Sequence, residues 1–162
     1  MFELNSLNAP EYLEKHQGIR SRNVRVRELG GGVSNTVLLI ETPESRLVLK
    51  QSLAKLRVEQ DWFSDRRRIL KEMAALKLIS GALPPGSVPE VIFEDAPNCL
   101  FGMTAGPPEA PSWKDILLRG GGDTQTASWI GEMLAETIRF SWQSSSLARE
   151  FGDLTVFDQL RL

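Results

Sequence analysis

Hydrophobic and polar residues alternate in short runs along the first part of the chain. Residues 24–29 place mostly apolar side chains between charged ones, which is the period-2 pattern of a half-buried strand. Residues 36–42 and 46–50 are two further β-rich runs, and the intervening Pro43-Glu44-Ser45 suits a short turn. These three segments predict an antiparallel meander.

The period changes to that of a helix over residues 65–81. Apolar residues recur at i, i+4 and i+7 from Ile69, which predicts an amphipathic helix. Two more strand candidates, residues 88–94 and 98–104, then predict a hairpin. The expected unit is a five-stranded antiparallel sheet with one packed helix, so the fold class is α+β.

A short helix is expected before the sheet. Asn8 is a capping side chain, Pro10 falls early in the first turn, and Gly18 would end the helix. Because this helix is short, we expect it to be peripheral.

The chain changes character after the sheet. Residues 105–111 are the densest Gly/Pro stretch and predict a linker. Ser112 can cap a helix of about two turns, and a longer helix should begin near Asp123 or Thr124. We interpret residues 1–104 as one lobe, 105–111 as a hinge and 112–162 as the start of a second, helical lobe. The tryptophans on its helices are expected in the core: Trp113, Trp129 and Trp142.

The composition is that of an ordinary globular protein. The 162 residues are 41% hydrophobic and 25% charged, with a formal net charge of −2. This near-balance argues against nucleic acid as a partner. Cys99 is the only cysteine and His16 the only histidine, so one chain can build neither a disulfide nor a Cys/His zinc site. Cys99 is interpreted as a small buried hydrophobe within a strand.

The sequence also argues against a membrane location. The longest strongly apolar run is residues 37–40, far short of the ~20 residues that span a bilayer. The N-terminus lacks the basic and apolar regions of a signal peptide. We therefore expect a cytoplasmic protein.

The most informative segment is a glycine-rich connection between two predicted strands, Gly30-Gly31-Gly32-Val33-Ser34-Asn35. Glycines in such a loop let backbone N–H groups approach phosphate oxygens. Neither a Walker-type loop nor a dinucleotide-binding turn fits, because both require a helix directly after the glycines. Compared with the kinase loop G-x-G-x-x-G-x-V, Asn35 replaces the third glycine. A hairpin turn without a ligand is the alternative.

Two charged residues strengthen the comparison with kinases. Lys50 ends the strand Leu47-Val48-Leu49-Lys50, like the lysine of the kinase pattern V-A-I-K. Glu72 lies on the following helix at the margin of its apolar face, where it can meet Lys50. The alternatives are an edge or snorkelling lysine and a surface pair of Glu72 with Arg68.

In combination these motifs resemble the aminoglycoside phosphotransferase-like small-molecule kinases. The chain is most similar to the methylthioribose-kinase branch, in which a Lys-Gln-Ser/Ala-Leu stretch and a following Trp recur, here residues 50–53 and Trp62. The resemblance extends through residues 88–95 and 100–104. It implies a kinase-like N-terminal lobe of five strands and one helix, followed by the first helices of an incomplete helical lobe.

The resemblance implies a role for each candidate residue. The loop Gly30, Gly31, Gly32, Ser34 and Asn35 would cover the phosphates of ATP, Lys50 would contact them, and Glu72 would anchor Lys50. The backbone around Met103, Thr104 and Ala105 would receive the adenine. The implied cofactors are ATP and Mg²⁺, and the implied acceptor is a small molecule with a hydroxyl group.

The catalytic loop of that family, His-Gly-Asp-x-x-x-x-Asn, is absent from this sequence. Residues 151–158 have its spacing, with Phe151 in place of His, Asp153 as the base and Asp158 as a magnesium ligand. The preferred interpretation is that both carboxylates are solvated or cap helices. We therefore assign no catalytic residue and no metal ligand.

The expected function is the ATP-binding portion of a small-molecule kinase, truncated before its catalytic loop and inactive by itself. The alternative is a non-catalytic module that binds nucleotide or docks on a protein. A truncated second lobe would leave the helix around Ile130 and Leu134 with an uncovered apolar face, so self-association is also expected.

Overall fold

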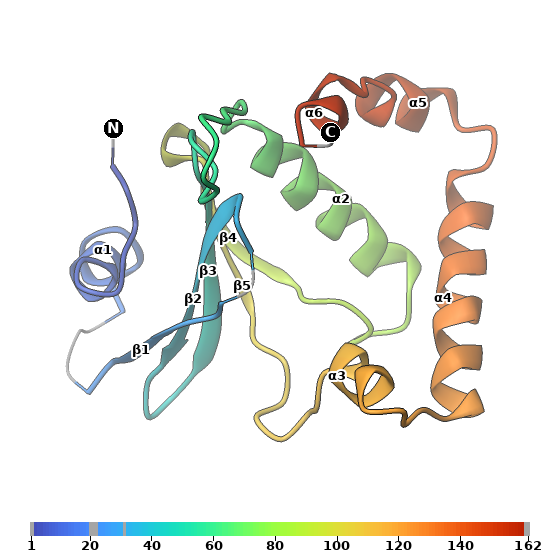
Figure 1. Ribbon diagram of the computed structural model, residues 1–162, viewed down its shortest axis with the longest axis horizontal. Helices are drawn as coiled ribbons and strands as arrows, with labels where there is room; N and C mark the ends of the chain where they lie inside the picture. Colours follow the sequence, from blue (N-terminus) through green and yellow to red (C-terminus); the bar gives the residue numbers. More distant parts are fainter. Residues whose placement is uncertain (1, 20–22, 31, 161–162) are drawn as a thin grey trace.

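One antiparallel sheet forms the centre of the molecule, with a helix on each face (Figure 1). The computed structural model describes residues 2–19, 23–30 and 32–160. The sheet has the strand order β1-β2-β3-β5-β4. Its strands are β1 (Arg25–Glu28), β2 (Asn35–Glu41), β3 (Arg46–Ser52), β4 (Val91–Asp95) and β5 (Leu100–Thr104). The α+β class and the five antiparallel strands are confirmed, and the arrangement is consistent with a kinase-like N-terminal lobe.

The predicted meander and hairpin are both present. Strands β1, β2 and β3 pair in sequence, and Val37 lies opposite Lys50. Strands β4 and β5 pair around a 3₁₀ turn, η1 (Ala96–Asn98). On β5, a side chain at Gly102 would collide with the ring of Phe93, at 2.3 Å from its nearest carbon. The absence of a side chain at Gly102 therefore lets Phe93 lie flat on the sheet.

The opening helix α1 (Ala9–Gln17) is part of the core, so the expectation that it is peripheral is wrong. Tyr12 and Leu13 are buried against Leu38 and Leu49 on one face of the sheet. The Tyr12 hydroxyl also donates to Asp95 Oδ2 at 2.7 Å. The helix ends at Gly18 in a left-handed conformation, as predicted, whereas the Asn8 side chain accepts from Asn5 N and does not cap α1.

A single buried amide joins the N-terminal segment to the sheet. Gln51 on β3 is fully buried. Its Oε1 accepts from Leu4 N at 2.6 Å, and its Nε2 donates to Phe2 O and Asn98 O at 3.1 and 2.9 Å. One buried side chain thereby satisfies three backbone groups.

The opposite face of the sheet is covered by α2 (Arg68–Ala82). Ile69 and Met73 on this helix pack against Phe101 and Cys99. Cys99 is buried, as expected, but it precedes β5 in a left-handed turn at φ 50° and does not lie within the strand. Alternate residues of β3 therefore face different layers: Leu47 and Leu49 face α1, and Lys50 faces α2.

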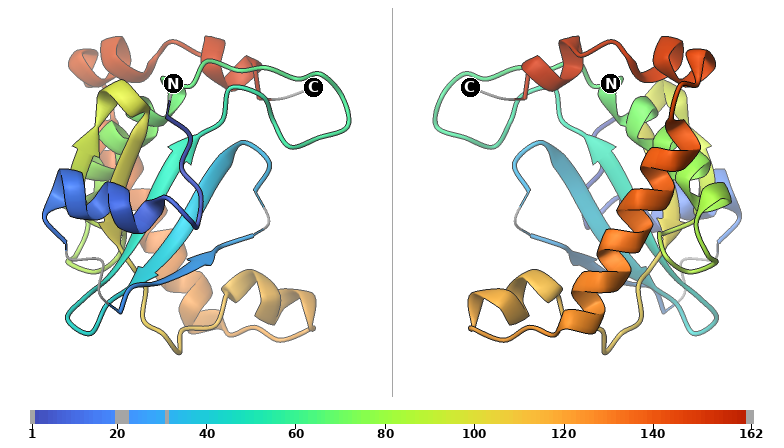
Figure 2. Two further views of the ribbon diagram at one scale, coloured as in Figure 1. Left: turned by 90° about the vertical axis from the view of Figure 1, so that its left-hand side faces the viewer. Right: turned by 90° about the vertical axis from the view of Figure 1, so that its right-hand side faces the viewer.

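Four helices follow the predicted hinge: α3 (Trp113–Leu118), α4 (Thr124–Ser141), α5 (Ser145–Phe151) and α6 (Thr155–Asp158). The predicted cap of α3 is present, because Ser112 accepts from Asp115 N. Helix α4 begins at Thr124, as predicted, and Asp123 caps it by accepting from Thr126 N. Helix α4 runs beside α2, on the side away from the sheet (Figure 2). Within the described ranges, no helix is long and apolar enough to cross a bilayer.

The expectation that the helical tryptophans are core residues is wrong for two of them. Trp129 is 56% exposed and Trp142 is 70% exposed, while Trp113 is half-buried. No residue of α4 is buried. The exposed apolar face expected around Ile130 and Leu134 is therefore present, whereas self-association through it stays a prediction.

Candidate functional site

The glycine-rich loop between β1 and β2 is open to solvent. Leu29 N donates to Val37 O at 2.8 Å and closes the loop at its base. A Cβ added at Gly30 or Gly32 would meet no atom within 4 Å, and neither residue has a positive φ. Crowding and backbone conformation do not demand glycine at these two positions. Gly30 and Gly32 instead leave space for another molecule to approach the backbone closely. Gly31 lies outside the described residues.

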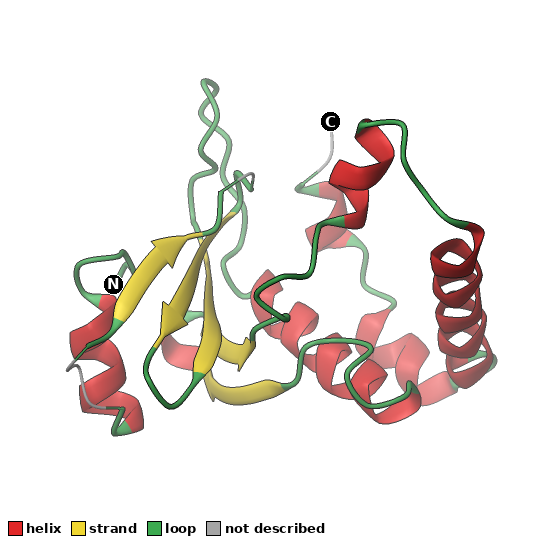
Figure 3. Cartoon of the chain, turned by 90° about the horizontal axis from the view of Figure 1, so that it is seen from below, coloured by secondary structure: helices red, strands yellow, loops and turns green. Residues whose placement is uncertain are grey.

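A second loop, residues 53–64, supports the glycine loop from one side. The two loops extend from the same end of the sheet (Figure 3). Leu53 N donates to Ser34 O at 3.0 Å, and Arg57 N donates to Val33 O at 2.8 Å. The Arg57 guanidinium also bonds Thr36 Oγ1 at 2.9 Å. The end of the glycine loop that leads into β2 is thus fixed by neighbouring backbone.

Lys50 and Glu72 form an ion pair between β3 and α2. Lys50 is on an interior strand, which excludes the edge-lysine interpretation. Its side chain is 19% exposed and that of Glu72 is 40% exposed, so the pair lies at the boundary between core and solvent. The guanidinium of Arg68 is directed to backbone carbonyls and does not form the predicted alternative bond to Glu72. The sheet and the helix therefore bring together the two residues as the kinase comparison predicts.

The predicted hinge lies at the other end of the same strands. Thr104 pairs with Leu47 on β3, whereas Asn35 pairs with Ser52, so Lys50 lies between the hinge and the glycine loop. Three residues of strand separate Lys50 from the hinge, or ~10 Å. Glycine loop, lysine and hinge therefore follow one another along the direction of the strands.

The hinge backbone is partly engaged within the sheet. Thr104 N donates to Glu90 O at 2.9 Å, and Thr104 Oγ1 accepts from Glu90 N at 3.0 Å. Met103 lies between Val48 and Val91. The Thr104 amide is therefore not free to donate to a planar ligand. The expected backbone contact with such a ligand is closer to Ala105.

A hollow of about 350 Å³ adjoins the glycine loop and the Lys50–Glu72 pair. It lies between the start of β2, the first turns of α2 and the last described segment of the chain. It is lined by Ser34, Asn35, Arg68, Lys71, Glu72, Phe151, Asp153, Leu154 and Leu160. A larger, apolar hollow of about 590 Å³ lies between α2, α4 and α5. The larger hollow is lined by neither Lys50, nor Glu72, nor the described residues of the glycine loop, so size alone does not identify the site.

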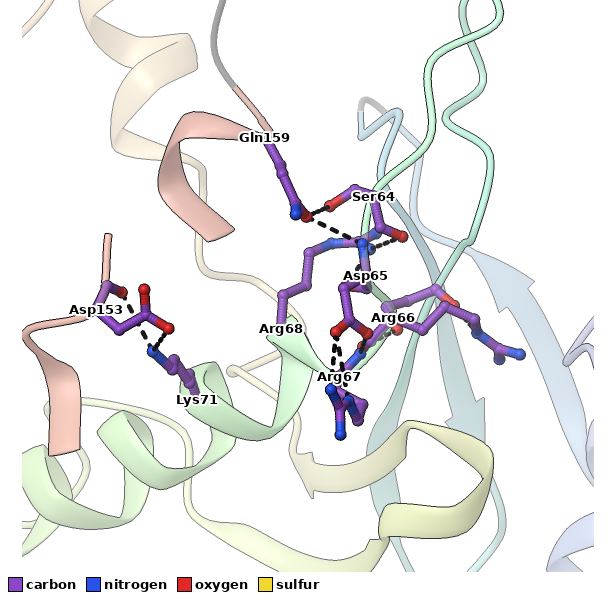
Figure 4. Close-up of polar contacts among 9 residues, drawn as sticks. Ser64, Asp65, Arg66, Arg67, Arg68, Lys71, Asp153 and Gln159 are labelled. Carbon is purple, nitrogen blue, oxygen red and sulfur yellow. Dashed lines mark hydrogen bonds and ion pairs between the residues drawn. The ribbon is translucent and has the colours of Figure 1, made fainter. Parts of the chain in front are cut away.

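The segment after α5 binds to the start of α2 through contacts that the sequence did not reveal (Figure 4). Asp153 Oδ2 forms an ion pair with Lys71 Nζ at 3.3 Å. Gln159 Oε1 accepts from Asp65 N at 3.1 Å, and Gln159 O accepts from the Trp62 indole at 2.7 Å. The acceptors on Gln159 are a side-chain amide oxygen and a backbone oxygen, which carry no recognisable sequence pattern.

Asp153 is held as a charged capping residue. Its Oδ1 accepts from the Thr155 hydroxyl and the Thr155 amide, and these bonds, with Lys71, lower the pKa of Asp153 to about 2. A carboxylate so stabilised is a poor proton acceptor at neutral pH. Asp158 lies on α6 and is exposed. In the part of the chain that the structure describes, no cluster of His, Cys, Asp and Glu is suited to hold a metal ion.

Comparison with known proteins gives one informative similarity. No family model matches the chain. The chain is similar to methylthioribose kinase 2 of Oryza sativa subsp. japonica, with 29% identity over 136 residues. The aligned part covers 83% of this chain and 32% of that protein, so the chain spans about a third of the length of this curated relative. The similarity supports a kinase-like family.

Proposed function

We propose that this chain forms the ATP-binding portion of a small-molecule kinase, which transfers the γ-phosphate of Mg·ATP to a hydroxyl group. The observation that carries the proposal is the Lys50–Glu72 ion pair. Lys50 lies on β3, which pairs on one side with β2, the strand after the open glycine loop, and on the other with β5, the strand before the predicted hinge. The similarity to a protein named methylthioribose kinase supports the same reaction class.

Each element has a defined task in this proposal. The backbone of the glycine loop, with Ser34 and Asn35, binds the phosphates of ATP. Lys50 supplies a positive charge to them, and Glu72 holds the ammonium group in place. The adenine lies against the backbone that follows Met103, near Ala105. Bound Mg²⁺ neutralises phosphate charge when ATP is present.

Transfer of the phosphate requires groups that the described residues do not bring together. An in-line transfer needs a positioned acceptor, an acceptor-side base and metal ligands. Asp153, whose spacing matched such a base, is committed to Thr155 and Lys71. We therefore expect this chain alone to bind nucleotide without transferring phosphate. The proposal includes a cytoplasmic location, where ATP and Mg²⁺ are present.

A non-catalytic nucleotide-binding or protein-docking module is the second candidate, favoured by the same commitment of Asp153. The two candidates differ in what the encoding reading frame contains. A frame that continues into a His-Gly-Asp-x-x-x-x-Asn loop and a later acidic motif supports the kinase. A frame that lacks both supports the module.

Calorimetric titration of Mg·ATP into the wild type and a Lys50→Ala variant tests the site. Loss of a charge-assisted contact costs about 1.5–3 kcal/mol, so affinity should fall about 10- to 100-fold. Lys77→Ala is the matched control, because Lys77 is on α2 but forms an exposed pair with Glu94. Its affinity should equal that of the wild type. Equal affinity of the Lys50 variant, or no binding by the wild type, contradicts the proposed site.

A further inference from the structure

Three consecutive arginines mark the beginning of α2, and their surroundings differ sharply (Figure 4). Arg66 and Arg68 are buried, with 8% and 6% exposure. The side chain of Arg67 between them is 77% exposed and pairs with Asp65. Buried arginines are uncommon unless their donors are satisfied, so the partners of the two buried guanidinium groups show what each one does.

Arg68 connects three separate segments of the candidate site. Its Nη2 donates to Ser34 O, at the end of the glycine loop, and to Leu53 O at 2.9 Å, just beyond β3. Its Nη1 donates to Asp65 O at 3.0 Å and Ser64 O at 3.4 Å. Burial lowers the pKa of Arg68, and Asp65 opposes that shift. The guanidinium thus holds the loop, the end of the lysine-bearing strand and the start of α2 together.

Arg66 is equally buried but bonds elsewhere. Its Nε donates to Ser52 O at 2.9 Å, and its Nη2 donates to Asn98 O and Phe2 O at 3.2 and 3.5 Å. These acceptors belong to β3, the β4–β5 turn and the N-terminal segment. Arg66 therefore stabilises the same end of the sheet without touching the glycine loop.

We propose that Arg68 is a positioning residue that holds the glycine loop in register with Lys50 and Glu72 for phosphate binding. The inference rests on the proposed function. Arg68 and Glu72 are four residues apart on α2, one helical turn or ~6 Å along the axis. One helix therefore carries both Arg68, which bonds the glycine loop, and Glu72, which pairs with Lys50.

The chemistry of the side chain explains why arginine is required. A guanidinium has five donors in a fixed plane, whereas a lysine ammonium has three donors at one point. Lysine keeps the charge and cannot reach carbonyls of three segments at once. Loss of the bond to Ser34 O leaves this end of the loop to the backbone bonds of Leu53 and Arg57, so the loop becomes more mobile and binding of phosphate costs more conformational entropy.

Matched arginine-to-lysine variants test this role. The probes are Mg·ATP, which carries phosphates, and adenosine, which does not, titrated at a temperature where each variant is folded by circular dichroism. We expect Arg68→Lys to weaken Mg·ATP binding about 10-fold and adenosine binding less than about twofold. Arg66→Lys should lower Tm and leave both affinities unchanged. Arg67→Lys should change neither Tm nor affinity.

The outcomes separate this inference from the proposed function. If the wild type binds no Mg·ATP, the proposed function fails, and the inference fails with it. If the wild type binds and Arg68→Lys binds equally well, only the inference fails. An equal loss for both probes, or the same loss in Arg66→Lys, makes Arg68 a purely structural residue and also overturns the inference.

Hydrogen–deuterium exchange of the wild type keeps the inference testable if Arg68→Lys does not fold. Because Arg68 joins the loop to the start of α2, Mg·ATP should slow exchange in peptides covering residues 32–36 and residues 64–70 together. Protection of the loop peptide with no change in the second peptide contradicts the coupling.

Discussion

Helices α2 and α4 both repeat apolar residues at helical spacing, but they have opposite surroundings. On α2, Ile69 and Met73 are buried against the sheet. On α4, Ile130, Leu134 and Ile138 are 42%, 60% and 50% exposed. The periodicity of apolar residues therefore predicts a helix and its apolar face, but not whether another element covers that face.

The largest expected difference between the two regions is in the free energy of unfolding. Leu49→Ala removes a fully buried side chain from the sheet and should destabilise the protein by about 2–5 kcal/mol. Leu134→Ala, on the exposed face of α4, should change stability by no more than about 0.5 kcal/mol. Urea denaturation followed by circular dichroism measures both values.

Equal losses from the two variants would show that the face of α4 is covered in solution. Sedimentation velocity over a concentration series then identifies a second copy as the cover. If copies associate through this face, Leu134→Ala should shift the population toward the monomer, and Leu49→Ala should affect association only through unfolding.

A smaller effect is expected where α1 joins the sheet. Tyr12→Phe removes the hydrogen bond to Asp95, so the free energy of unfolding should fall by about 1–2 kcal/mol at neutral pH. Burial raises the pKa of Tyr12, and its bond to Asp95 raises it further. The phenol therefore stays a neutral donor. In urea denaturation, the double variant Tyr12→Phe/Asp95→Asn should lose less than the sum of the single losses.

The same contact has a defined pH dependence. Burial alone would raise the pKa of Asp95, but bonds from Asn98 and Tyr12 outweigh it and leave the pKa below its ordinary value. The stabilisation is thus present above the unfolded pKa of 3.8 and is lost as pH falls below it. Acid unfolding of Tyr12→Phe should begin at a higher pH than that of the wild type, and coincident curves would contradict this.

The smallest effect concerns the joint between the last segment and α2. An NMR titration should give Asp153 a pKa of about 2. Thr155→Ala should raise this pKa most, and Lys71→Ala should raise it less, because each removes a donor to the carboxylate. Its contribution to stability is lost as pH falls from 3.8 toward 2. An unchanged pKa of Asp153 in Lys71→Ala would show that the segment is not bound to α2 through this ion pair.

Much of the sheet region was predictable from the sequence because its signals are local. Alternation located the first strand and runs of β-forming residues located the other four, all within a few residues, and turn residues located the hairpins. Lys50 and Glu72 were found because the comparison with kinases specifies a strand lysine and a helix glutamate. Their contact joins residues that are 22 positions apart, so strand and helix signals alone would not have paired them.

The remaining features depend on partners that the sequence does not identify. The burial of α1 follows from the apolar face of a sheet formed much later in the chain. Arg68 and Gln159 were missed because several of their partners are backbone atoms, which every residue possesses. Trp129 and Trp142 were assigned to the core because they lie on helical segments, but no described segment covers them.

The two edge strands of the sheet, β1 and β4, determine how copies of the protein can associate. Strand β1 forms one edge and exposes Arg25 and Arg27. Strand β4 forms the other edge, where Glu94 is exposed and the pairing with β5 is irregular next to Val91. Charged and irregular edge strands disfavour the addition of another strand. Growth of a fibril by strand addition is thus disfavoured at both edges of the sheet, so the exposed apolar face of α4 is the more favourable surface for contact between copies.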